Sequence, residues 1–158
     1  MPAPSDASQP RDSAQASPPD EQPSTDRSQS PVTTLRVPLR VRYRECDPMN
    51  VAHHSVYPVW LEIARTELLR QRGSTYRELE AAGVFLVVAR MSLRYRRPAV
   101  YDDELEIEVT SLPTAGVKLQ HTYRVLRDNE LLASAETTLA CVDRQGQLRP
   151  VPTAVLEP

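Results

Sequence analysis

One long apolar helix in the first half of the chain constrains the fold most. The segment HSVYPVWLEIARTELLRQRG, residues 54–73, has Ser55 as a candidate N-cap, Pro58 in the first turn and Gly73 at the exit. Residues at helical spacing form one apolar stripe, namely Tyr57, Trp60, Leu61, Ala64 and Leu68, and Val56, Val59 and Ile63 widen it. Because the first half of the helix is apolar on most of its circumference, we expect other structure to wrap it on most sides.

Segments with strand periodicity lie on both sides of this helix. TTLRVPLRVRYRE, residues 33–45, places Leu35, Val37, Leu39, Val41 and Tyr43 on one face, which predicts a half-buried strand. Pro38 lacks a backbone donor, so this strand belongs at a sheet edge. The segment 74–83 predicts a short helix with a capping box at Thr75 and Glu78.

Four more strand-like segments follow at 84–98, 104–112, 117–127 and 131–143, and the last two are joined by a turn at Asp128-Asn129-Glu130. One long helix and five mostly antiparallel strands predict an α+β fold in which a curved sheet surrounds the helix.

The composition changes sharply near residue 32. Residues 1–32 are rich in Pro, Ser, Asp and Gln and have almost no large apolar side chain, so we expect a disordered tail followed by one domain at 33–158. A net charge of −2 over 158 residues gives no electrostatic case for nucleic acid or an anionic membrane as a partner. Two cysteines and the absence of a run of ~20 apolar residues favour a reducing, cytoplasmic location without membrane insertion.

The stretch ECDPMNVAHHSVY, residues 45–57, leads from the first strand into the long helix. A helix N-terminus offers unpaired amides and a positive dipole end that can stabilise an oxyanion, and an upstream carboxylate such as Asp47 can act as nucleophile or general base. On the residues alone, Asp47 as a simple turn residue is the preferred interpretation. Adjacent histidine side chains are expected to diverge and lack further ligands at zinc spacing, so no metal site is expected at His53 and His54. Cys46 lacks a dedicated base and is expected to be an inert thiol.

The chain resembles the hotdog fold, and more narrowly the 4-hydroxybenzoyl-CoA thioesterase family and the acyl-CoA thioesterases encoded beside bacterial Tol–Pal genes. Four segments carry the resemblance: VRYRECDPMNVAHHSVY, WLEIARTELLR, FLVVARMSLRYRRPAVYDDELEIE and CVDRQGQLRPVP. The resemblance implies an acyl-CoA thioesterase in which Asp47 is the catalytic carboxylate and the His54 amide polarises the thioester carbonyl. It implies no cofactor beyond the CoA of the substrate, and a homodimer or homotetramer, because hotdog sites form between subunits.

Substrate contacts are expected at several further positions. Met49-Asn50 stands where relatives carry a small or glycine-containing pair, so Asn50 is expected to adopt the left-handed conformation and Met49 to shape the acyl pocket. Tyr57 is expected beside the pocket. Arg94, Arg96 and Lys118 are the candidate ligands of the CoA phosphates.

Two other functions stay open from the sequence. A hotdog enoyl-CoA hydratase or dehydratase would use Asp47, Asn50 and His53, although Val51 replaces the proline of those relatives. A non-catalytic acyl-CoA-binding module would use the same pocket. Glu62 is an alternative acid or base, and a polar helix flank is the preferred interpretation for it.

Overall fold

The computed structural model describes residues 32–113 and 116–156. The predicted disordered tail, residues 1–32, lies outside the described residues apart from Val32. The elements, in chain order, are β1 (Thr33–Arg40), η1 (Tyr43–Glu45), η2 (His54–Val56), α1 (Tyr57–Gln71), α2 (Tyr76–Ala81), β2 (Phe85–Tyr95), β3 (Glu104–Ser111), β4 (Lys118–Arg127), β5 (Glu130–Val142) and α3 (Thr153–Leu156). No helix of the described residues is long and apolar enough to cross a membrane.

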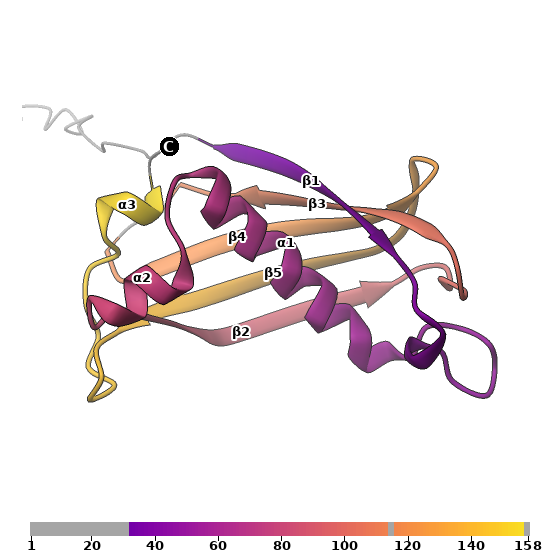
Figure 1. Ribbon diagram of the computed structural model, residues 1–158, viewed down its shortest axis with the longest axis horizontal. Coiled ribbons are helices and arrows are strands. Elements are labelled where there is room, and N and C mark those ends of the chain that lie inside the picture. Colours follow the sequence, from indigo (N-terminus) through magenta and orange to yellow (C-terminus); the bar gives the residue numbers. More distant parts are fainter. Residues whose placement is uncertain (1–31, 114–115, 157–158) are drawn as a thin grey trace, which may run out of the picture.

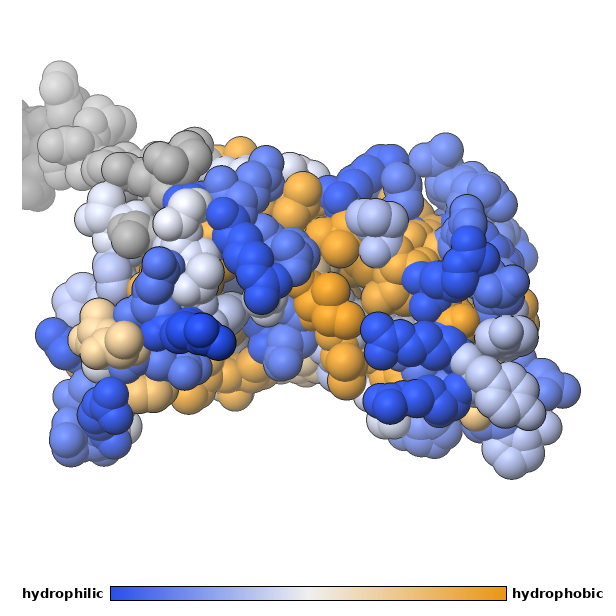
Figure 2. All heavy atoms as spheres, in the orientation of Figure 1, coloured by the Kyte–Doolittle hydropathy of each residue, from blue (hydrophilic) through white to orange (hydrophobic). Residues whose placement is uncertain are grey.

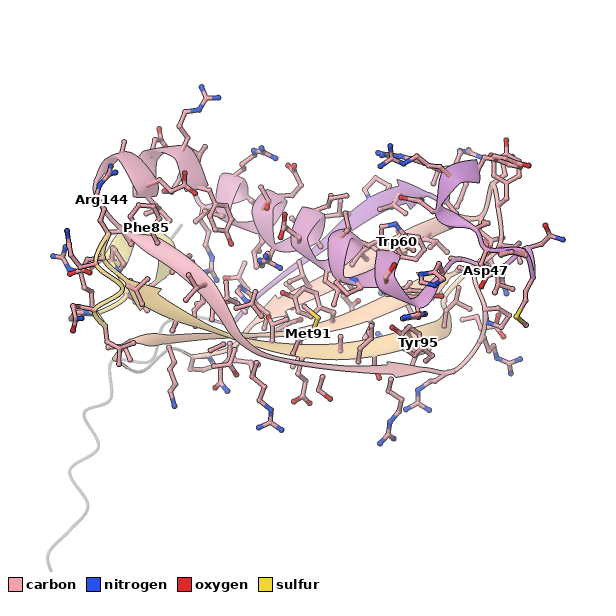
Figure 3. The ribbon with its side chains drawn as sticks, turned by 90° about the horizontal axis from the view of Figure 1, so that it is seen from below. Asp47, Trp60, Phe85, Met91, Tyr95 and Arg144 are labelled. Atoms are coloured by element: carbon pink, nitrogen blue, oxygen red, sulfur yellow. The ribbon has the colours of Figure 1, made fainter. Side chains whose placement is uncertain are left out.

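The five strands form one antiparallel sheet in the order β1-β3-β4-β5-β2, and α1 crosses one face of it (Figure 1). Seen from below, the sheet curves beneath the helix, and Trp60 and Met91 lie between the two layers (Figure 3). This is the α+β hotdog architecture that the sequence predicts. The strands β1 and β2 are the two edges of the sheet.

The helical stripe predicted from the sequence is the centre of the core. Tyr57, Trp60, Leu61, Ala64 and Leu68 are all buried, and they pack against inward-facing residues of β1, β3, β4 and β5. The residues that widen the stripe are less covered: Val59 is 54% exposed and Ile63 is partly buried. Within one chain, therefore, the sheet covers one side of α1 and leaves apolar side chains on the other. Figure 2 shows apolar surface over the middle of this face and charged groups toward both ends.

The first strand ends earlier than its alternation predicts. β1 stops at Arg40, and Tyr43 lies in the 3₁₀ turn η1 with 81% of its surface exposed. The turn forms because the Glu45 carboxylate accepts a hydrogen bond from the amide of Arg42 (2.8 Å) while the Glu45 amide donates to the Arg42 carbonyl (3.0 Å). The prediction for Tyr43 was wrong because local side-chain-to-backbone bonds ended the ladder where the apolar alternation continued.

The other local predictions hold with small shifts in boundary. Gly73 ends α1 with φ 78°, and Thr75 and Glu78 form the predicted capping box of α2. The β4–β5 hairpin pairs Arg127 with Glu130, so its turn has two residues, Asp128 and Asn129, with φ 50° and 65°. Glu130, predicted in the turn, is instead the first residue of β5.

Candidate active site

The loop between η1 and α1 is held in a tight turn by Asp47. The Asp47 amide donates to the Val51 carbonyl and the Asn50 amide to the Asp47 carbonyl, both at 2.9 Å. One carboxylate oxygen, Oδ1, accepts the Met49 amide at 2.8 Å. Asn50 has φ 61°, which confirms the left-handed conformation expected of it. Asp47 is thus a turn residue, as one interpretation had it, but Oδ2 has no donor among the described residues and is available for chemistry.

The start of the helix differs from the prediction that Ser55 caps it. His53 takes that role: its Nδ1 accepts the Ser55 amide (3.4 Å) and forms a hydrogen bond with the Ser55 hydroxyl (2.8 Å). The Val56 amide donates to the His53 carbonyl at 3.0 Å. The His54 amide has no backbone acceptor in the described part of the chain, as expected for the first turn of a helix. The two imidazole rings lie 4.1 Å apart, so the expectation that they diverge was wrong.

A chain of aromatic and polar contacts joins this helix start to the sheet. The Tyr95 hydroxyl, at the end of β2, donates to the His54 carbonyl at 2.8 Å. The rings of Tyr95 and Tyr57 meet edge to face with centroids 5.0 Å apart, and Tyr57 in turn packs on Trp60. The Trp60 indole N–H donates to the Glu45 carboxylate (3.3 Å), next to the Asp47 turn. Burial raises the pKa of the Tyr57 and Tyr95 hydroxyls, so both are protonated donors at neutral pH.

These elements border a cavity of about 340 Å³ that is wide open to solvent. Its lining consists of Asp47, Val51, Ala52, His54, Tyr57, Tyr95, Arg96, Arg97 and Pro98. Asp47 lies beside the N-terminal end of α1, with Tyr95 on the strand below (Figure 3). The structure therefore brings together four residues predicted from the sequence: Asp47, His54, Tyr57 and Arg96. Tyr95 was not identified from the sequence as a site residue. Its place in the alternation of β2 predicts packing, and no sequence pattern predicts its hydrogen bond to His54.

The other predicted substrate residues lie outside this cavity in a single chain. Met49 and Asn50 are on the exposed tip of the Asp47 turn, where Met49 is 79% exposed. Arg94 lines a separate groove on the sheet, which Arg96 also borders. Lys118 is at the far end of the sheet: it pairs with Ala140, whereas Tyr95 pairs with Ala133, about 23 Å away along β5 at ~3.3 Å per residue.

Other nucleophiles and metal ligands near the loop have little support. Burial, together with the negative charges of Asp47 and Glu45, raises the pKa of the Cys46 thiol, which disfavours the reactive thiolate. Glu62 is on the exposed side of α1 and pairs with Arg65 at 2.9 Å, as a polar flank would. Among the described residues, no group of three or more His, Cys, Asp and Glu side chains is close enough to hold a metal ion.

Comparison with known proteins identifies the family of the chain. Residues 41–158 match the model of the Thioesterase-like superfamily. The acyl-CoA thioester hydrolase YbgC of Escherichia coli O6:H1 is 38% identical over 112 residues, covering 70% of this chain and 84% of that protein. The chain belongs to this superfamily and is a thioester hydrolase of the hotdog fold.

Solved structures give the same result for the fold. A probable thioesterase from Bartonella henselae superposes with a TM-score of 0.72 at 26% identity, covering 76% of this chain and 100% of that one. A hypothetical protein from Thermus thermophilus superposes with a TM-score of 0.73 at 34% identity, covering 78% of this chain and 93% of that one.

Proposed function

We propose that the protein hydrolyses an acyl- or aroyl-CoA thioester to the free acid and CoA. The observation that carries the proposal is that the Asp47 carboxylate and the His54 helix start line the same cavity. The relatives named for acyl-CoA thioester hydrolysis support the substrate class. The cavity volume is in the range that holds a small ligand or an acyl segment.

In the proposed mechanism the thioester carbonyl lies between Asp47 and the His54 amide. The amide and the positive end of the helix dipole stabilise the oxyanion that forms as the carbonyl carbon is attacked. Asp47 Oδ2 either attacks this carbon directly, giving an anhydride that water cleaves, or removes a proton from an attacking water. In both routes a C–O bond forms, the C–S bond breaks, and CoA leaves as a thiol once protonated. This chemistry needs no metal and no added cofactor.

Arg96 is the side chain best placed to receive a phosphate of CoA. Its neighbour Arg97 is paired with Glu130 at 2.9 Å, whereas Arg96 makes no ion pair with a described residue. Because Arg96 borders both the Asp47 cavity and the groove that contains Arg94, a ligand can extend from one to the other. Met49, Asn50 and Lys118 remain proposed substrate contacts.

A homodimer, or a tetramer built from it, completes the proposal. The edge strand β2 pairs only with β5 among the described strands, and its Val87 and Val88 are 45% and 43% exposed. The opposite edge, β1, carries Pro38, which blocks part of its ladder. Pairing of two β2 edges would cover apolar surface and an open backbone ladder. The two free cysteines fit a reducing compartment, so we also propose the cytoplasm.

The hydratase alternative receives less support from the site. Its mechanism requires Asn50 and His53 beside Asp47, but neither lines the cavity, and the His53 Nδ1 is engaged by Ser55. A non-catalytic acyl-CoA-binding module would bind acyl- or aroyl-CoA esters without hydrolysing them.

A thiol-release assay over a panel of acyl- and aroyl-CoA esters tests the function. We expect free CoA to appear in proportion to enzyme for at least one chain length or aryl group. Binding without thiol release would favour the non-catalytic module. Water addition to an enoyl-CoA, with no thiol released from any ester, would favour the hydratase.

A further inference from the structure

A second, small cavity lies at the other end of α1 from Asp47. It is lined by Arg65, Leu68, Leu69, Arg72, Tyr76, Leu86, Leu119, His121 and Val155, which come from α1 and its end, α2, β2, β4 and α3. Arg72 follows Tyr57 by fifteen residues, a separation of about 22 Å along a helix. The cavity is therefore separate from the proposed active site and needs its own explanation.

Arg72 places a buried positive charge in this cavity that pairs with no carboxylate of the described residues. Only 7% of the residue is exposed, and its Nη1 donates to the Val155 carbonyl at 2.7 Å. Its Nε and Nη2 are buried and have no hydrogen-bond partner among the described residues. No carboxylate of the described residues lies within 4.0 Å of this guanidinium. A buried charge normally has a partner of opposite sign, because desolvation of an unpaired ion is costly.

Arg65 adds a second positive charge to the lining of the cavity, and His121 adds a buried neutral ring. Arg65 is 8% exposed and donates to the Tyr76 hydroxyl at 3.3 Å; its carboxylate partner Glu62 faces solvent, with a side chain 66% exposed. His121 is 4% exposed, and its Nδ1 also has no partner among the described residues. Burial and the charges of Arg65 and Arg72 lower the pKa of His121 to about 4, so the ring is neutral at pH 7. Arg65 and Arg72 thus line the same space, and among the described residues no carboxylate pairs with Arg72 there.

We infer that this cavity is a binding site for a small monovalent anion of halide size, held by Nε and Nη2 of Arg72. The size of the space sets the class of ligand. The volume available to the centre of a water-sized sphere is about 10 Å³, which is room for one particle of that size. This space excludes sulfate, phosphate and carboxylic acids. A water molecule there would satisfy hydrogen bonds, whereas a halide would also offset the buried charge.

Thermal unfolding at constant ionic strength tests the site, with sodium chloride replaced stepwise by sodium gluconate, whose anion is too large to enter. Constant ionic strength removes general screening as an explanation. A ligand that binds only the folded state stabilises it in proportion to the logarithm of its concentration. We expect the Tm to rise by about 4 °C per tenfold increase in chloride once the site is largely occupied.

Three variants locate the effect. Arg72→Met should abolish the chloride response, and Arg77→Met, the same change on the exposed surface of α2, should retain it. Glu157→Gln removes a carboxylate that follows α3 in the sequence and should also retain the response. A wild type without any chloride response would overturn the inference.

Anomalous scattering from crystals of the wild type grown with bromide gives a test that does not depend on how the variants fold. We expect a bromide peak within hydrogen-bonding reach of Arg72 Nε and Nη2. Density for water alone at this position contradicts the inference. A bromide peak without a chloride response in solution also contradicts it, since binding would then occur only at crystal concentrations.

Discussion

We propose that the Tyr95 hydroxyl positions the His54 amide, the proposed oxyanion donor, through its hydrogen bond to the backbone of His54. It donates to the carbonyl of His54, and its ring packs edge to face against Tyr57. Tyr95→Phe keeps the ring and removes this one hydrogen bond. We expect kcat to fall by about three- to tenfold, the equivalent of one ordinary hydrogen bond, with a smaller change in KM. Tyr101→Phe, at an exposed tyrosine outside the cavity, is the matched control; equal effects of the two changes would exclude a positioning role.

His121 gives the protein a pH dependence of its own. Its pKa is about 4 in the folded state, against about 6.5 unfolded, so the unfolded chain binds more protons between these values. Stability from this group is fully present above pH 6.5 and is lost as the pH falls toward 4, by on the order of 2–3 kcal/mol. Denaturant unfolding in chloride-free buffer measures the free energy of unfolding at each pH. Between pH 6.5 and 4 this free energy should fall more steeply with decreasing pH for the wild type than for His121→Gln. Parallel pH profiles would contradict it.

Among the secondary-structure elements, Glu45 links the loop that contains Asp47 to α1 through hydrogen bonds. Its carboxylate accepts the Trp60 indole N–H and the Arg42 amide, and the residue is 9% exposed. Glu45→Ala leaves both donors unsatisfied and should reduce the free energy of unfolding by about 1–3 kcal/mol. Glu45→Gln offers one acceptor oxygen and should lose less. Urea titrations that rank the alanine variant at or above the glutamine variant in stability would contradict this role.

The sequence predicts elements well where one strong pattern decides them. The stripe from Tyr57 to Leu68 places α1 on the sheet, and alternation finds all five strands. Prediction from the sequence fails where short-range polar bonds compete with periodicity. The Glu45 carboxylate ends the strand before Tyr43, so Tyr43 is not part of β1. At the start of the helix, His53 takes the capping role predicted for Ser55.

The residues of the candidate site are likewise predictable only where they lie close together in the sequence. Asp47, His54 and Tyr57 lie within eleven residues, so one motif contains them all. Tyr95 joins them through the packing of β2 against the helix start, which no local pattern encodes. Lys118 was assigned from sequence order, and the antiparallel register places it at the opposite end of the sheet within one chain.

For the whole molecule, the open edge of β2 is the proposed interface between protomers. Apolar surface continues from α1 toward the lower edge of the face in Figure 2, where β2 lies in Figure 1. Val88→Lys introduces a charge on this edge, which disfavours strand pairing between copies. We expect a smaller species in sedimentation at concentrations where the wild type is a dimer. Thr34→Lys on the β1 edge is the control, and dissociation by both changes, or by the control alone, would contradict an interface at β2.

The proposed hydrolysis depends on the ionised carboxylate of Asp47, as nucleophile or as general base. Asp47→Asn tests it directly, because the amide oxygen can still accept the Met49 amide and preserve the turn while the carboxylate is lost. Asp128→Asn makes the same change in the exposed β4–β5 turn. The measurement is kcat for thiol release on the best ester of the panel. We predict a loss of about 10²- to 10⁴-fold for Asp47→Asn, an unchanged Tm and no loss for Asp128→Asn. Turnover by Asp47→Asn at the wild-type rate would contradict the account.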